Sequence, residues 1–88
     1  MNVHYLKIDA RYYQAVVDGR KTAEIRINDR DFKVGHYLSL HESKNGELTE
    51  SDAVLLKITH IVNSDEFRGL AAGFVLLSFE FIEVLVHD

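Results

Sequence analysis

The sequence contains no cysteine, no proline and no apolar run long enough to cross a membrane. Without cysteine, neither a disulfide nor a thiolate metal site can form. Without proline, every residue can donate a backbone hydrogen bond, which is compatible with a sheet closed into a barrel. The N-terminus also lacks a basic segment followed by an apolar one, so we expect no signal peptide. Together these absences suit a cytoplasmic location away from the membrane.

Size and charge indicate one small globular domain. The 88 residues are 47% hydrophobic and 27% charged, so we expect a single folded domain over residues 1–88. The formal net charge of −4 argues against a strong nonspecific grip on nucleic acid. Residues 1–36 nevertheless hold seven Lys and Arg against five Asp and Glu, whereas residues 37–88 hold three against nine. An anionic ligand would therefore be expected at the N-terminal third.

The spacing of apolar residues predicts the order of the elements. Alternating or continuous apolar stretches predict strands at residues 3–8, 22–27, 37–42, 53–62 and 74–86. The 53–62 strand is apolar on both faces near its start, so it should be central. Asp9 is a suitable N-cap for a helix over residues 10–17. Turn formers at 44–46 predict a hairpin within residues 43–52, and residues 78–80 could hold a bulge or a bend.

These elements predict an α+β fold. Most strands alternate instead of being uniformly apolar, which favours antiparallel pairing. We expect a small, mostly antiparallel β-barrel of about five or six strands with one early α-helix. Residues 65–71 could add a short second helix of one turn, although Gly69 and Gly73 argue against a longer one.

Residues 19–26 join the helix to the second strand and are rich in charge. Gly19, in the left-handed conformation, would end the helix. From Thr22 onward the two-residue period puts Glu24 and Arg26 on one face and the apolar residues between them on the other. Lys21 would converge with Glu24 only if the strand begins after Lys21 or bulges. A carboxylate between two cations could bind an anionic or amide-bearing ligand, or it could be an exposed row of ion pairs.

The pattern Gly-x-Lys-x-x-Glu-x-Arg at residues 19–26 resembles the signature of ASCH (activating signal cointegrator homology) domains of the PUA-like superfamily. The likeness covers most of the chain and points to a small bacterial and phage branch of that family. Outside the signature it is carried by Lys7-Ile8, Tyr12-Tyr13, Ala15-Val16, Asn28-Asp29-Arg30, Phe32, Val34-Gly35, Leu38, Leu40 and, more faintly, residues 74–79. Gly35-His36 departs from the Gly-Asp expected at that turn.

The resemblance implies a PUA-like barrel with a cleft beside the early helix. ASCH domains are proposed to bind RNA or modified nucleotides, so RNA or a modified nucleotide or nucleoside is the implied partner. In such a cleft Lys21 could meet a phosphate, Arg26 could hold an oxyanion pair or stack on a base, and Glu24 could accept from an exocyclic amine. The implied binding residues are Tyr12, Gly19, Arg20, Lys21, Thr22, Glu24 and Arg26.

Two other functions stay open. A related bacterial group hydrolyses N4-acetylcytidine with the signature lysine, a threonine and a distant acid. Here Lys21 keeps the lysine position, Glu24 stands where the threonine would be, and only Asp65 and Glu66 are available as the acid. An amidohydrolase acting on acylated cytidine, with Lys21 and Glu24 as catalytic residues, is therefore less favoured than a binding module. The third hypothesis is a protein-interaction domain that uses the acidic C-terminal half or an edge of the last strand.

Cofactors and metals are not expected. His4, His41 and His60 fall on three predicted strands but lack a recognisable ligand spacing, so we expect separate histidines. Nothing resembles a glycine loop that cradles phosphate. We expect a monomer or a weak homodimer. Three further arginines could add positive charge to the cleft or be ordinary surface cations: Arg11, Arg20 and Arg30.

Overall fold

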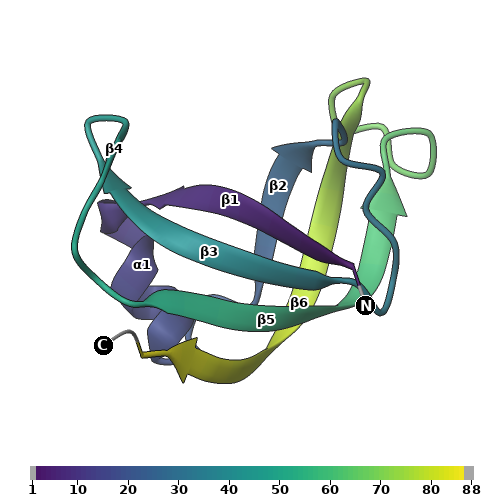
Figure 1. The fold of residues 1–88 in the computed structure, drawn as a ribbon. Coiled ribbons are helices and arrows are strands. Elements are labelled where there is room, and N and C mark those ends of the chain that lie inside the picture. Colours follow the sequence, from purple (N-terminus) through teal and green to yellow (C-terminus); the bar gives the residue numbers. More distant parts are fainter. Residues whose placement is uncertain (1, 87–88) are drawn as a thin grey trace.

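The computed structural model describes residues 2–86, and the predicted domain, residues 1–88, extends beyond them at both ends. Within the described residues the chain forms one helix and several strands (Figure 1). The elements are β1 (Val3–Asp9), α1 (Ala10–Val17), β2 (Ala23–Ile27), β3 (Tyr37–Lys44), β4 (Glu47–Leu48), β5 (Ala53–Asn63) and β6 (Phe74–Leu85). No helix in this part of the chain is long and apolar enough to cross a membrane.

The strands form one strongly curled sheet in the order β1-β3-β5-β6-β2, with β4 paired to β3 off this path. Every pairing is antiparallel except that of β1 with β3. The predicted α+β fold with a mostly antiparallel, barrel-like sheet is confirmed, and β5 is the central strand. The parallel pair was not predicted. It is possible because α1 and β2 intervene, which supplies the long crossover that parallel neighbours need.

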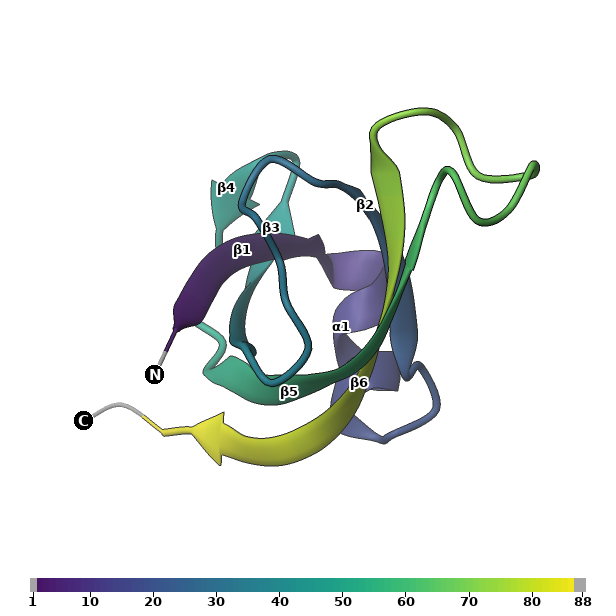
Figure 2. The same cartoon turned by 90° about the vertical axis from the view of Figure 1, so that its right-hand side faces the viewer.

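The core fills the inside of the curled sheet. Alternate residues of each long strand point inward, as the two-residue period requires. The helix and the 28–36 segment lie at opposite ends of the half-barrel (Figure 1; Figure 2 looks at the end that carries the segment). Each adds a buried side chain to the core, Val16 and Phe32 respectively. The inward residues of the strands are Leu6, Ile8, Leu38, Leu40, Val54, Leu56, Ile58, Val75, Leu77 and Phe79.

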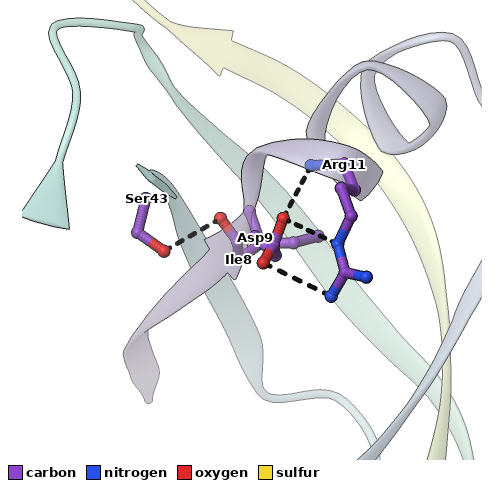
Figure 3. Close-up of polar contacts among 4 residues, drawn as sticks. All are labelled: Ile8, Asp9, Arg11 and Ser43. Carbon is purple, nitrogen blue, oxygen red and sulfur yellow. Dashed lines mark hydrogen bonds and ion pairs between the residues drawn. The ribbon is translucent and has the colours of Figure 1, made fainter. Parts of the chain in front are cut away.

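Both ends of α1 are capped as the sequence predicts. The Asp9 side chain accepts a hydrogen bond of 2.8 Å from the Arg11 backbone N–H, which is the N-cap contact drawn in Figure 3. At the other end Gly19 has a φ of +76°. Its N–H donates to the Val16 carbonyl, and the next N–H donates to the Ala15 carbonyl, which is a Schellman motif. The chain therefore leaves the helix in a fixed direction toward β2.

The hairpin within residues 43–52 is also confirmed. Asn45 and Gly46 both have positive φ, as a type I′ turn requires, and they join β3 to β4. Glu42 then holds the returning chain by accepting hydrogen bonds from Thr49 and Ser51. These two bonds keep the pKa of the Glu42 carboxyl below its usual value, and the bond from Ser51 has the larger effect.

Two register shifts curl the long β5–β6 pair. One places the extra residue Thr59 of β5 opposite the step from Ser78 to Phe79. The other places the extra residue Ile82 on β6. The irregularity expected at residues 78–80 is therefore present, but its extra residue belongs to the partner strand. Such bulges increase the local twist and bend the strand that carries them.

The structure does not contain the short second helix that residues 65–71 could have formed. The described chain from Asn63 to Phe74 consists of turns, with single hydrogen bonds from the N–H of Glu66 to Asn63, of Leu70 to Phe67 and of Phe74 to Ala71. Each bond spans three residues, so separate turns replace the four-residue ladder of an α-helix. This segment extends away from the half-barrel (Figure 2), and most of its residues are exposed, so little packing is available to support a helix there.

The core can be tested at Leu56, which is 0% exposed in the central strand. Replacing it by Ala should lower the free energy of unfolding by roughly 2–5 kcal/mol, because buried methyl groups are lost and a cavity remains. The same change at Leu48, which is 59% exposed, should cost less than about 0.5 kcal/mol. Urea denaturation of both variants measures the difference. Equal losses would contradict this core.

Candidate functional site

The candidate site lies where the curled sheet fails to close. β1 and β2 are the two ends of the strand order, and no backbone ladder joins them within residues 2–86. The side chain of Arg26 on β2 spans the gap instead, and that of Arg30, in the segment after β2, also reaches β1. The Arg26 guanidinium donates to the Lys7 carbonyl of β1, and Arg30 donates to the Tyr5 carbonyl at 3.1 Å. Side chains, and not a ladder, therefore connect the two edges.

A cleft of about 410 Å³ opens between these edges, and we call it the β1–β2 cleft. Its floor is apolar, from inward residues of β1, and its walls carry charge. The lining residues are Leu6, Ile8, Asp9, Tyr12, Glu24, Ile25, Arg26, Ile27, Asp29, Arg30 and Phe74.

Glu24 and Arg26 face the inside of the sheet. In the β2–β6 register they stand opposite Leu77 and Val75, two core residues, and directly opposed residues share a face. The Glu24 side chain is 14% exposed and the Arg26 side chain 23%, whereas Ile25 on the other face is 58% exposed. The predicted parity is therefore correct, with the charged face turned inward and the apolar face outward.

The two charges form a close pair. Arg26 Nε lies 2.7 Å from Glu24 Oε2. Because the same guanidinium also donates to the Lys7 carbonyl, it is fixed at two points and holds the carboxylate at the cleft wall. A partly buried, charge-assisted pair of this kind is more ordered than an exposed ion pair.

A second cavity of about 420 Å³, the side pocket, opens next to the cleft. It is lined by Tyr12, Lys21, Ala23, Glu24, Ile25 and Leu76. Tyr12, Glu24 and Ile25 line both spaces, so the cleft and the side pocket are adjoining. Lys21 and Glu24 share the side pocket, and this is possible because β2 begins at Ala23, after the junction residue.

Lys21 is held at the lip of the side pocket. Its Nζ donates to the Ala23 carbonyl at 2.8 Å and lies 5.3 Å from the centre of the Tyr12 ring. The Arg11 guanidinium lies 5.1 Å from the same ring. The two cations thus approach a tyrosine that is 42% exposed. This places an aromatic surface and positive charge together at the entrance.

The other residues predicted for the site lie outside both cavities. Gly19 is the left-handed residue that follows the helix C-cap, Asp18. Arg20 pairs with Asp18 at the surface, and Thr22 is exposed while its carbonyl accepts from the Phe79 N–H. These three residues therefore set the path of the chain into β2, and the cavity walls are formed by their neighbours.

Sequence reasoning missed part of the lining. Asp9 was predicted only as a helix cap and Asp29 was named only as part of the family resemblance, yet both line the cleft. Of the three further arginines, Arg30 lines the cleft, whereas Arg11 pairs with Asp9. The run of turn formers at 28–31 was the available signal, but it gave no indication that this turn meets the edge of β1.

The residues considered for other chemistry are engaged elsewhere. Glu66, a candidate acid for the amidohydrolase, accepts the Asn63 N–H at 2.7 Å within its own turn. His41 contacts Ser39 and the ring of Tyr5, while His4 pairs with His36. Among the described residues no three His, Asp or Glu side chains gather where they could hold a metal ion.

A double-mutant cycle tests the inner ion pair. Glu24→Gln and Arg26→Gln should each destabilise the fold, but the double variant should lose less than their sum, with a coupling of roughly 0.5–3 kcal/mol. The reason is that each single change leaves the remaining charge partly buried without its partner. Chemical denaturation at pH about 7 provides the free energies.

The matched control is Asp18 with Arg20, an ion pair of the same chemistry at exposed positions, which should couple more weakly. If the Glu24–Arg26 pair coupled no more strongly than this control, the inner pair would not be the organised contact described here.

Comparisons with known proteins place the chain in a family. Over residues 3–79 it matches the family described as "Domain of unknown function (DUF3850)". A protein of Escherichia phage P2, described as "Uncharacterized 12.9 kDa protein in GpA 3'region", is 40% identical to it over 47 residues. That match covers 53% of the chain and 43% of the phage protein, so the chain corresponds to less than half of this relative's length. Since the family match runs from β1 into β6 and includes every residue of the cleft, the chain belongs to the DUF3850 family.

Proposed function

We propose that the chain is a binding module for RNA or a nucleotide, and that the ligand enters the β1–β2 cleft and the adjoining side pocket. The observation that carries the proposal is the Glu24–Arg26 pair fixed on the inner face of an edge strand, beside an exposed aromatic ring. The resemblance of residues 19–26 to the ASCH signature supports the same site.

Each wall offers a contact that a nucleotide can use. The Glu24 carboxylate accepts hydrogen bonds, as required by an exocyclic amine of a base. The Tyr12 ring is exposed enough to stack on a base, which is a common mode of single-strand recognition. Lys21 and Arg30 lie at the edges of the two cavities, where their charges could meet phosphate. The proposed contacts thus combine one acceptor, one ring and flanking cations.

Size and charge favour a small or single-stranded ligand. A volume of about 410 Å³ falls in the range of small-molecule sites. The net charge of −4 is unfavourable for wrapping duplex nucleic acid, and the cleft itself is lined by three carboxylates and two arginines. A nucleotide or a few unpaired residues of RNA therefore fit better than a long duplex.

A second candidate function rests on the shared lining of the side pocket. Lys21 and Glu24 both face this space, so an acylated cytidine bound there would meet an amine and a carboxylate. That arrangement would suit the amidohydrolase, with Lys21 as base or nucleophile. The third hypothesis, a protein-interaction domain, and the cytoplasmic location of a monomer or weak homodimer stay predictions of the sequence.

Titration of 15N-labelled protein with cytidine, N4-acetylcytidine and a short mixed-sequence RNA tests the proposal. Backbone amide shifts should concentrate at Tyr12, Lys21, Glu24 and Arg26. Tyr12→Ala should weaken binding roughly tenfold, because stacking on an aromatic ring contributes about 1–3 kcal/mol per base. Loss of the acetyl group in the same samples would identify the enzyme.

Lys33→Ala is the matched control for charge, since Lys33 pairs with Asp31 at the surface and does not line the cleft. It should leave the affinity unchanged. Shifts spread over the surface, or an equal effect of Lys33→Ala and Lys21→Ala, would mean that binding is nonspecific and that the proposed site is wrong.

A further inference from the structure

Two histidines meet at the end of the half-barrel opposite α1. His4, at the start of β1, points to the inner face of the sheet with Leu6 and Ile8. His36 ends the 28–36 segment, which crosses this end of the barrel (Figure 2). His4 Nε2 lies 2.9 Å from His36 Nδ1, and His36 Nε2 lies 2.9 Å from Asn2 Nδ2. The side chains of Asn2, His36 and His4 thus form a continuous row of polar contacts, with His36 in the middle.

The geometry of the pair is that of a shared proton. The ring centres are 5.1 Å apart and the two facing nitrogens 2.9 Å apart. The two nitrogens therefore lie close to the line that joins the ring centres. The nitrogens therefore point at each other and not at a common third point, as two ligands of one metal ion would. One nitrogen must carry the hydrogen and the other must accept it. If both carried hydrogen, the contact would become repulsive.

The surroundings of His4 disfavour its charged form. The ring packs edge-on against Phe32, with ring centres 4.8 Å apart, and Leu38 of β3 stands opposite His4 in the sheet. Burial lowers the pKa of His4 below its usual 6.5, and His36 and Arg30 lower it further. Asp31 acts in the opposite direction. From β5 the neighbouring contact is made by the Ile58 backbone, which brings no charge.

The pair lies where the 28–36 segment is attached to the sheet. The Gly35 N–H donates to the Ile58 carbonyl and the Ile58 N–H donates to the His36 carbonyl, so the end of the segment is tied to β5. His4–His36 is the side-chain tie to β1. Arg30, in the same segment, donates to the Tyr5 carbonyl next to His4. The segment is thereby held against β1 at two neighbouring points.

We propose that the His4–His36 pair is a proton-operated latch that fastens the 28–36 segment to β1 at neutral pH and releases it in mild acid. In the neutral pair the Asn2 amide nitrogen donates to His36 Nε2, so the His36 hydrogen lies on Nδ1 and is donated to His4 Nε2. A proton added at His4 Nε2 fills that acceptor, and the contact persists only if the His36 hydrogen moves to Nε2, which removes the bond from Asn2. Either way the segment loses one side-chain tie to the start of the chain, and the new charge beside Arg30 weakens the Arg30 contact at the edge of the cleft.

The sign of the effect follows from the lowered pKa. The unfolded chain takes up the proton near pH 6.5, whereas folded His4 takes it up only at lower pH. The contribution of the latch to stability is therefore complete above pH 6.5 and is lost as the pH falls from there through the lower pKa of the folded state. The latch itself does not depend on a ligand. Only its effect on ligand affinity, through Arg30, rests on the proposed function.

Histidine ring spectra, combined with amide hydrogen exchange between pH about 8 and about 5, test the latch. His4 should titrate below 6.5, and Gly35 and His36 amides should exchange about tenfold faster once it is charged, after correction for intrinsic rates. In His36→Gln the titration midpoint of His4 should rise, because the second imidazole no longer opposes its charge. His60→Gln, a change on β5 outside the pair, should leave the His4 curve unchanged.

If His4 titrated at or above 6.5, or if its titration left the Gly35 and His36 amides unchanged, there would be no latch. These measurements need no ligand, so a failure of the proposed function would not affect them. Conversely, a confirmed latch with no nucleotide binding would separate the two proposals. Should His36→Gln fail to fold, the wild-type titration still decides.

Discussion

The contact on which this structure depends is the Arg26 guanidinium between the two unpaired edges of the sheet. A curled sheet of this size leaves two edge strands, and exposed edges are open to pairing with other chains. Here Arg26 and Arg30 donate to two backbone carbonyls on the outer edge of β1, so these two acceptors already have hydrogen-bond partners. The cleft lies between the same two edges that the Arg26 bridge connects. The bridge also fixes Glu24 at the wall, where a ligand would meet it.

This arrangement explains an inverted pattern in β2. A half-buried strand normally turns its apolar residues inward, yet Ile25 and Ile27 are exposed and the ion pair is turned inward. The inner face of β2 lies at the mouth of the half-barrel, where Arg26 can reach β1 and where the charges are still partly hydrated. Placing charge there sacrifices some apolar burial, and departures of this kind from local pattern rules are typical of functional positions.

The sequence was most informative where structure is local. Asp9 and Gly19 predict both ends of the helix, Asn45-Gly46 predicts the hairpin turn, and the two-residue period predicts the shared face of Glu24 and Arg26. Contacts between distant segments could not be predicted in this way. The parallel pairing of β1 with β3, the reach of Arg30 to the Tyr5 carbonyl and the meeting of His4 with His36 all depend on how the sheet curls. The short second helix considered at residues 65–71 does not form for a related reason. That segment is mostly exposed, and a short helix needs tertiary packing to be stable.

The most direct test of this account is the Arg26 side-chain Nε–H signal, followed by NMR before and after addition of cytidine 5′-monophosphate. If the guanidinium bridges Glu24 and the Lys7 carbonyl, the signal should exchange slowly with water and report contacts to β1. It should then move when the nucleotide enters the cleft. A signal that exchanges as fast as that of a free arginine would contradict the bridge. A protected signal that stays fixed while nucleotide binds elsewhere would contradict the cleft as the binding site.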